Sequence, residues 1–149
     1  MARKKLTWRE KLLESRGHPT VQPVSEKMSQ RWGTGTMVIP APIEVDEFMR
    51  SVRKGELITI DDIRRQLAAK HGADFACPIT TGIFAWIAAH AADEAEQEGK
   101  KRITPYWRTL KTGHELNAKY PGGIANVKAR LEAEGHTVVQ RRKRFFIDV

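Results

Sequence analysis

The sequence is poor in residues that form covalent or metal-linked structures. Cys77 is the single cysteine among 149 residues, which excludes an internal disulfide and a zinc site built only from cysteines. The histidines are scattered without metal-ligand spacing, and neither standard phosphate-binding glycine loop is present. We therefore expect no metal and no cofactor. A lone thiol is typical of a reducing cytoplasm.

Long hydrophobic runs are also missing. No apolar stretch approaches the roughly 18 to 20 residues that a membrane span requires. The first ten residues, MARKKLTWRE, are basic and lack the apolar core of a secretion signal. We therefore expect a cytoplasmic protein with no membrane association.

Acidic residues are the minority among the charged ones. The chain has 26 Lys and Arg against 18 Asp and Glu, which gives a formal charge of +8 and a pI near 9.9. An excess of this kind favours a polyanionic partner, because cationic side chains contact phosphates and release their counterions. The alternative is that the charge serves solubility only.

The length of the chain suits one domain with an appended arm. In residues 1–42, Thr7 and Glu10 form a predicted capping box that opens a short helix through about Ser15, and a second short helix is expected over 25–32. Helices this short are marginal on their own in water. We therefore expect this arm to pack on the main domain, residues 43–149.

In the main domain, hydrophobic periodicity and capping signals predict helices over 45–53, 59–71, 79–98 and 123–134. Two helices joined by a tight turn are typical of a helix-turn-helix, and a terminal hairpin beside them would be its wing. We therefore expect a mainly α fold, a winged helix-turn-helix domain with a C-terminal β-hairpin and an N-terminal arm. The extended segments are expected at 56–60, and at 137–140 and 144–149 for the hairpin.

In such a domain the first turn of the recognition helix reaches the DNA. The helix predicted over 79–98 therefore contacts DNA through Thr80, Thr81 and Gly82, unless this turn is a plain N-terminal cap of a core helix. The apolar side chains that follow are assigned to its buried side: Ile83, Phe84, Ile87 and Ala91.

The predicted hairpin has a cationic tip. A run of charge is usually a solvated turn, but on a chain that is already cationic phosphate contact is the favoured interpretation. The tip consists of Arg141, Arg142, Lys143 and Arg144.

Residues 103–123, ITPYWRTLKTGHELNAKYPGG, show no obvious helix or strand. They contain a proline-anchored turn at 105–108, a basic turn at 111–114 and a Tyr-Pro-Gly-Gly bend at 120–123. A loop this long inside a compact domain is usually either functional or disordered. Its aromatic residues argue against disorder.

Together with the helix that follows, this stretch resembles the C-terminal half of O6-alkylguanine-DNA alkyltransferases, the methylated-DNA-protein-cysteine methyltransferases. The likeness covers about 43–136 and includes the upstream segment RKGELITIDDIRRQL. Residues 105–108 stand on the proline, cysteine, histidine and arginine of the family's Ile-Pro-Cys-His-Arg-Val motif. Tyr120, Gly122 and Gly123 match its Tyr-x-Gly-Gly bend, and Glu134 matches the glutamate that orients its histidine.

The departures from the family pattern bear on the function. Tyr106 stands at the alkyl-accepting cysteine and Trp107 at the activating histidine, and a phenol with a reference pKa near 10 is a poor acceptor at neutral pH. Gly82 replaces an arginine that fills the gap left by a flipped base, and Ile60 replaces a tyrosine that helps to rotate the phosphate. The segment from Pro78 to the motif is also longer, by roughly two helical turns.

The resemblance therefore implies the alkyltransferase-like branch, which lacks the acceptor cysteine and binds alkylated DNA without repairing it. We expect a monomer that binds duplex DNA in DNA repair, with a repair protein as a possible partner. Arg108 and Lys111 join the predicted DNA contacts, although Arg108 has a second interpretation as a lock of its turn through carbonyl groups. The expected non-reactive pocket consists of Pro105, Tyr106, Trp107, Tyr120, Gly122, Gly123 and Glu134.

Two alternatives come from other classes. In the first, the pocket is rebuilt for another reaction on a nucleobase, with Tyr106 or Cys77 as participant and Glu134 as acid or base. In the second, the chain is a protein-interaction module, for which the N-terminal arm is the feature to test by truncation of residues 1–40.

Overall fold

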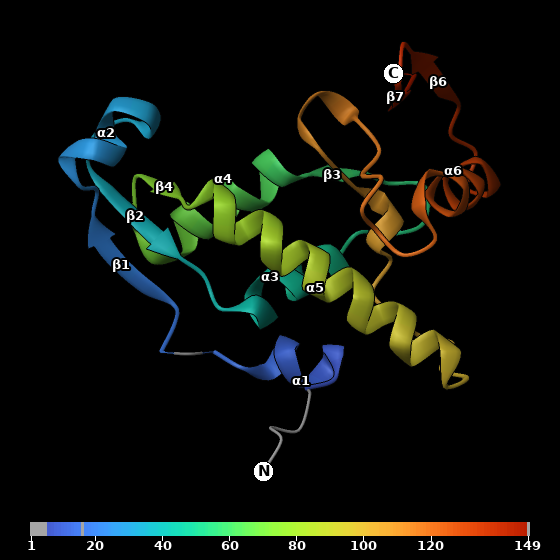
Figure 1. Cartoon of the computed structure of the whole chain (residues 1–149), viewed down its shortest axis with the longest axis horizontal. Coiled ribbons are helices and arrows are strands. Elements are labelled where there is room, and N and C mark those ends of the chain that lie inside the picture. The colour runs from blue at the N-terminus through green and yellow to red at the C-terminus, as the bar shows by residue number, and fades with distance from the viewer. Residues whose placement is uncertain (1–5, 16, 149) are drawn as a thin grey trace.

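The structure is a computed structural model that describes residues 6–15 and 17–148. These residues form six α-helices and seven short strands in three small sheets, a mixed α/β architecture (Figure 1). The expectation of a mainly α fold therefore holds only in part. The basic residues at 3–5 and the predicted end of the hairpin at 149 lie outside the described residues.

Helix α5 (Pro78–Gln97) crosses the middle of the molecule, and α1 (Trp8–Leu13), α3 (Pro42–Arg50) and α4 (Ile60–His71) pack against it (Figure 1). Its start agrees with the sequence, since Pro78 occupies the first turn. Its buried face consists mainly of small side chains, which allow the neighbouring helices to come close. These are Thr81, Ala85, Ala88, Ala89, Ala91 and Ala92.

The predicted buried side of this helix is wrong in part. Ala91 is buried and Phe84 and Ile87 are partly buried, but Ile83 is 46% exposed. Periodicity alone favoured the larger apolar residues, whereas the helix buries its alanine face. The isoleucine is left on the opposite side, next to an open hollow.

Helix α4 begins and ends as predicted. Thr59 accepts a hydrogen bond from the backbone N–H of Asp62, and the Asp62 side chain accepts one from the backbone of Thr59. Gly72 ends the helix in the left-handed conformation at φ 64°. Ile63 and Leu67 are fully buried. The predicted capping box thus fixes the orientation of the helix that precedes α5.

The N-terminal arm completes a sheet of the main domain. Strand β1 (Thr20–Pro23) pairs antiparallel with β2 (Thr36–Ile39), which pairs parallel with β4 (Phe75–Ala76), the connection between α4 and α5. The predicted helices are both present, as α1 with the capping box of Thr7 and Glu10 and as α2 (Glu26–Trp32). Helix α1 ends at Leu13, before the expected Ser15. Leu12 and Val38 belong to the hydrophobic core, so arm and domain share one core.

The stretch 103–123 contains more secondary structure than the sequence predicted. It holds two 3-10 helices, η1 (Tyr106–Arg108) and η2 (Thr112–His114), and the strand β5 (Thr109–Leu110) between them. Strand β5 pairs parallel with β3 (Ile58–Thr59). This contact joins segments about fifty residues apart in sequence, which local patterns cannot reveal.

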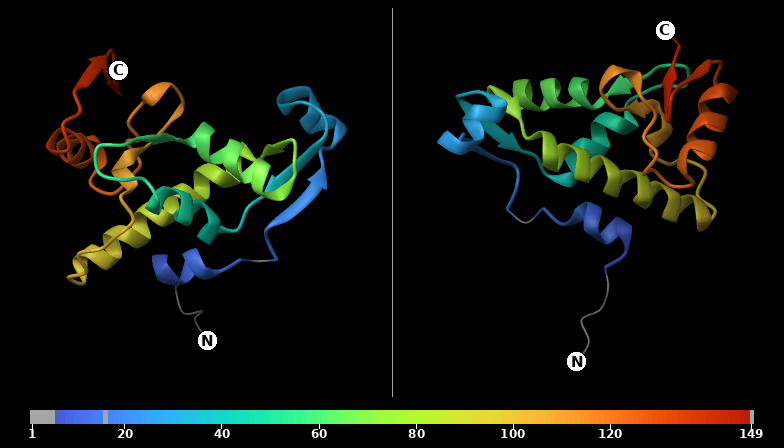
Figure 2. Two further views of the ribbon diagram at one scale, coloured as in Figure 1. Left: turned by 180° about the vertical axis from the view of Figure 1, so that it is seen from behind. Right: turned by 45° about the horizontal axis from the view of Figure 1, so that its top comes forward.

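The C-terminal elements agree with prediction. Helix α6 (Gly123–Ala133) precedes an antiparallel hairpin of β6 (Val138–Arg141) and β7 (Arg144–Ile147). The backbone N–H of Leu116 donates to the carbonyl of Phe145 over 2.9 Å, which attaches the hairpin to the 103–123 stretch. Figure 2 shows the hairpin, this stretch and α6 grouped at the same end of the molecule. Within the described residues, no helix is both long enough and apolar enough to cross a membrane.

Candidate functional site

The aromatic residues of the predicted pocket pack on one another. The Tyr106 ring lies edge-to-face against Trp107 at 5.2 Å and against Tyr120 at 5.9 Å between centroids. Their exposed fractions are 0% for Tyr106, 9% for Trp107 and 3% for Tyr120, and Pro105 is buried beside them. The rings fill the space that they were expected to enclose. The predicted pocket is therefore closed, and this prediction is wrong.

The Tyr106 hydroxyl is held by a polar network. It accepts a hydrogen bond from Asn126 Nδ2 over 2.9 Å, and Asn126 Oδ1 accepts one from Arg130 Nε over 3.0 Å. Burial raises the pKa of the Tyr106 phenol, and the nearby Arg130 and Asn126 offset this only in part. The phenol stays neutral at physiological pH. Because Cys77 is also buried, neither residue is accessible to a substrate in this structure.

Glu134 and Arg108 form an ion pair at the end of α6. Arg108 Nη2 lies 2.6 Å from Glu134 Oε2 and Arg108 Nε lies 2.9 Å from Oε1, while Trp107 Nε1 donates to Oε2 over 3.1 Å. Burial would raise the pKa of Glu134, but the hydrogen bonds from Arg108 and Trp107 outweigh it and lower the pKa. Glu134 therefore has a structural role, because its carboxylate is already bound by Arg108 and Trp107.

The same contacts argue against the predicted DNA contact by Arg108. Its side chain is only 13% exposed, and its Nη1 donates to the carbonyl of Val52 over 2.8 Å. As in the second interpretation, Arg108 binds a backbone carbonyl, although this carbonyl belongs to Val52 and not to the turn of Arg108 itself. At the nearby bend, Gly122 has φ 77°, and a Cβ there would lie 2.5 Å from Asn126 Cβ, so this position requires glycine. Gly123 also has a positive φ.

An open hollow lies between the first half of α5 and the 111–119 segment, and no residue of the closed aromatic cluster lines it. Its volume is about 830 Å³, within the range of ligand pockets. Ile79 and Ile83 border it and are 56% and 46% exposed. The hollow is lined from α5 by Ile79, Gly82, Ile83, Trp86 and His90, and from the segment by Lys111, Glu115, Asn117, Ala118 and Lys119.

This hollow continues toward the hairpin. A second hollow of about 440 Å³ shares Gly82, Lys111, Glu115 and Asn117 with the first and also touches Arg144. A third of about 910 Å³ is lined by Arg144 and the rest of the hairpin tip, together with Gly113 and Phe146. The structure therefore brings together these predicted DNA contacts along one face: Gly82, Lys111, Arg141, Arg142, Lys143 and Arg144.

The two threonines of the predicted contact turn do not belong to this face. Thr81 is fully buried, and its hydroxyl donates to the carbonyl of Cys77 over 2.6 Å. The hydroxyl oxygen of Thr80 is buried and has no hydrogen-bond partner among the described residues. The predicted contact by Thr81 is wrong, because its side of α5 is the alanine face. The exposed side presents Ile79, Ile83 and Trp86, which sequence reasoning had not assigned to the site.

The Glu115 carboxylate and the Phe146 ring hold the cations of this face in place. Glu115 is largely buried, with Lys111 Nζ at 3.8 Å on one side and Arg144 Nε at 3.9 Å on the other. The guanidinium carbons of Arg141 and Arg144 lie 5.6 Å and 5.4 Å from the centre of the Phe146 ring. These contacts orient the cations while residues 141–144 stay exposed.

Comparison of the chain with protein-family models, with curated proteins and with solved structures gave no significant match. The alkyltransferase resemblance therefore stays a hypothesis that depends on the residues quoted for it.

Proposed function

We propose that this protein binds duplex DNA as a winged helix-turn-helix protein of the alkyltransferase-like type and recognises an alkylated base without transferring the alkyl group. In this proposal α4 and α5 are the helix-turn-helix and the β6–β7 hairpin is the wing. The observation that carries it is the continuous run of hollows that joins the exposed first turns of α5, Lys111 and the cationic hairpin tip.

The chemistry of this face suits a duplex. Helix N-termini favour phosphate because their N–H groups are unpaired and the helix dipole is positive there. Gly82 lets a backbone approach closely, while Ile79 and Ile83 offer apolar contact to base edges. The exposed cations at 141–144 suit phosphates, in line with the formal charge of +8.

The closed aromatic cluster supports recognition without transfer. The residue at the acceptor position, Tyr106, is fully buried and its pKa is raised, so it is neither accessible nor nucleophilic. The hydrogen bond from Trp107 to Glu134 stands where the resemblance puts a histidine held by a glutamate. Large side chains, those of Tyr106 and Trp107, thus stand at the positions of the family's acceptor cysteine and activating histidine.

In this proposal an extruded base enters the 830 Å³ hollow beside Trp86. Stacking on an aromatic side chain contributes on the order of 1 to 3 kcal/mol per base. The cationic rim of Lys111 and Lys119 attracts the flanking phosphates. In this proposal the protein is a cytoplasmic monomer, and a repair partner acts on the lesion that it has bound.

Binding to a short duplex with and without one O6-alkylguanine, measured over a series of salt concentrations, tests the proposal. We expect tighter binding to the alkylated duplex and an affinity for both that falls as salt rises. Equal and salt-insensitive binding to the two duplexes would contradict it. Mass spectrometry of the protein after incubation should find no alkyl adduct on Tyr106 or Cys77, and an adduct or a released base would favour the enzyme alternative.

A further inference from the structure

Three aromatic rings join the N-terminal arm to the open hollow. The Trp8 ring of α1 stacks on His90 of α5 at 4.5 Å and 24°, and it meets Trp86 edge-on at 4.8 Å and 88°. Trp86 and His90 also contact each other, at 5.0 Å and 70°. These two rings line the hollow. Trp8 therefore packs against both aromatic side chains that α5 contributes to the wall of the hollow.

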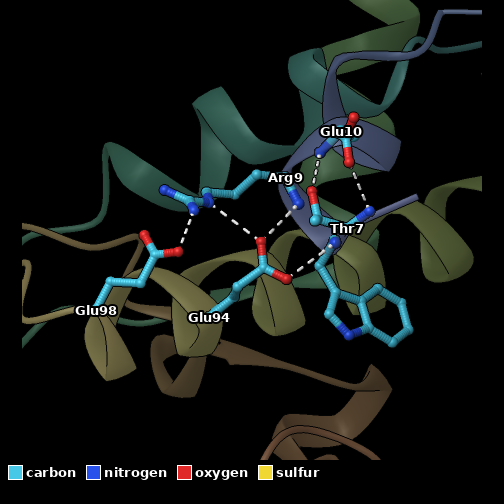
Figure 3. Close-up of polar contacts among 6 residues, drawn as sticks. Thr7, Arg9, Glu10, Glu94 and Glu98 are labelled. Carbon is cyan, nitrogen blue, oxygen red and sulfur yellow. Dashed lines mark hydrogen bonds and ion pairs between the residues drawn. The ribbon is translucent and has the colours of Figure 1, made fainter. Parts of the chain in front are cut away.

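The position of Trp8 is fixed by a carboxylate on α5. The backbone N–H groups of Trp8 and Arg9 donate to the Glu94 carboxylate over 3.2 Å and 3.3 Å. Arg9 Nε donates to Glu94 over 3.1 Å, and Arg9 Nη2 reaches Glu98 at 2.5 Å (Figure 3). Because Glu94 lies one helical turn after His90, α1 is held directly beside the aromatic rings.

Two further contacts hold α1 in this place. Lys11 Nζ lies 4.4 Å from the centre of the Trp8 ring, and Leu12 is buried in the hydrophobic core. Without Trp8, His90 would lose its stacking partner and Trp86 its edge contact. Both rings could then adopt other rotamers, and the wall of the hollow would change shape.

We propose that Trp8 is a positioning residue for the hollow on α5: it holds Trp86 and His90 in one arrangement and so sets the preference of the site for a flat aromatic ring such as a nucleobase. The inference depends on the proposed function for the nature of the ligand. The position of the rings can be tested without any ligand.

The first experiment uses NMR of the full chain and compares wild type with Trp8→Ala. Because loss of the Trp8 ring current shifts nearby signals whether or not the rings move, the readout is the pattern of NOEs between the Trp86 and His90 rings, which we expect to change. The indole signal of Trp107, which is bound to Glu134, should stay in place as an internal control. Trp86→Phe and Trp107→Phe assign the two signals. Unchanged NOEs between the Trp86 and His90 rings in Trp8→Ala would overturn the inference.

The second experiment measures the ratio of affinities for the alkylated and the unmodified duplex. Trp8→Ala should lower this ratio about fivefold, the effect expected from losing one aromatic contact, and Trp8→Phe should restore much of it. Leu12→Ala is the matched control, since it removes a buried side chain of the same helix outside the three-ring cluster. It should lower the melting temperature and leave the ratio unchanged.

The outcomes separate the two proposals. If the wild type binds no duplex, the proposed function fails, and the NOEs between the Trp86 and His90 rings still decide whether Trp8 positions the wall. If Leu12→Ala lowers the ratio as much as Trp8→Ala does, Trp8 acts only through stability and the inference is overturned. A loss of preference confined to Trp8→Ala, with rescue by Trp8→Phe, supports it.

Discussion

Arg108 and Glu134 form a largely buried ion pair in which two guanidinium nitrogens face two carboxylate oxygens, at 2.6 Å and 2.9 Å. This pair fastens η1 to the end of α6, and the hydrogen bond from Arg108 to the Val52 carbonyl extends the connection to the segment after α3. Arg108 is therefore part of the framework that supports the candidate site. Of the cations predicted to contact DNA, Lys111 and the hairpin tip are the ones exposed at the surface.

Arg108→Ala should lower the free energy of unfolding by about 2 kcal/mol, because it leaves the largely buried Glu134 carboxylate without its cation. Urea denaturation measures this effect. Arg65→Ala is the matched control, since the ion pair of Arg65 with Asp62 is exposed and should contribute less than about 1 kcal/mol. Similar losses in the two variants would show that the Arg108 pair is not a structural anchor.

The stability of the protein should depend on pH through Glu134. Its pKa in the folded state is lowered from the ordinary value of 4.5, so its contribution is fully present above about pH 4.5 and is lost as the pH falls through the lowered pKa. The difference in unfolding free energy between wild type and Glu134→Gln should be constant at neutral pH and shrink in acid. A difference that grows as the pH falls would contradict the assignment.

Tyr106→Phe should cost about 1 kcal/mol of stability, because Asn126 loses the hydroxyl that accepts its hydrogen bond. Duplex binding should be unchanged, since the ring is buried and outside the hollow on α5. Thermal denaturation and a binding titration measure the two effects. A strong loss of affinity without a loss of stability would mean that the phenol contacts the ligand.

Tyr106→Cys should not restore alkyl transfer while Trp107 remains. A thiol at this position has no adjacent base, and the Glu134 carboxylate is already bound by Arg108 and Trp107. Peptide mass spectrometry after incubation with an alkylated duplex would locate any adduct. Rapid self-alkylation of the new cysteine would count against this account of the site.

Local signals in the sequence predicted much of the fold. The capping boxes at Thr7 and Thr59, the proline at the start of α5 and the hairpin around residue 142 all depend on neighbouring residues, so short-range rules identify them. The small residues at 81, 85, 88 and 92 recur at helical spacing. That spacing could have identified the buried face of α5, but the prediction followed the larger apolar residues instead.

The rest of the candidate site depends on contacts between distant segments. Trp8 and His90 are stacked although 82 positions separate them, and the packing of Tyr106 against Tyr120 closes the pocket that the resemblance implied. Neither contact follows from periodicity or from a motif. The sequence therefore predicted the hairpin with its cationic tip, but it placed the open space at aromatic residues that are buried.

Arg142→Ala and Lys143→Ala should each reduce the slope of log affinity against log salt by about 0.9, the value for one phosphate contact on duplex DNA. Their stability should not change, since both residues are exposed. Lys101→Ala is a control of equal charge change beyond the far end of α5, which lies roughly 22 Å along the helix from Gly82. If all three variants reduced the slope equally, binding would depend on net charge rather than on the hairpin.

The central claim is that the exposed first turns of α5, the 111–119 segment and the hairpin tip form one DNA-binding face. Titration of the labelled full-length protein with an O6-alkylguanine duplex, followed by NMR of the backbone amides, tests it most directly. The account predicts that the largest shifts fall in residues 79–90, 111–119 and 141–144. Shifts confined to β1 and α2, or no shifts at duplex concentrations well above that of the protein, would contradict it.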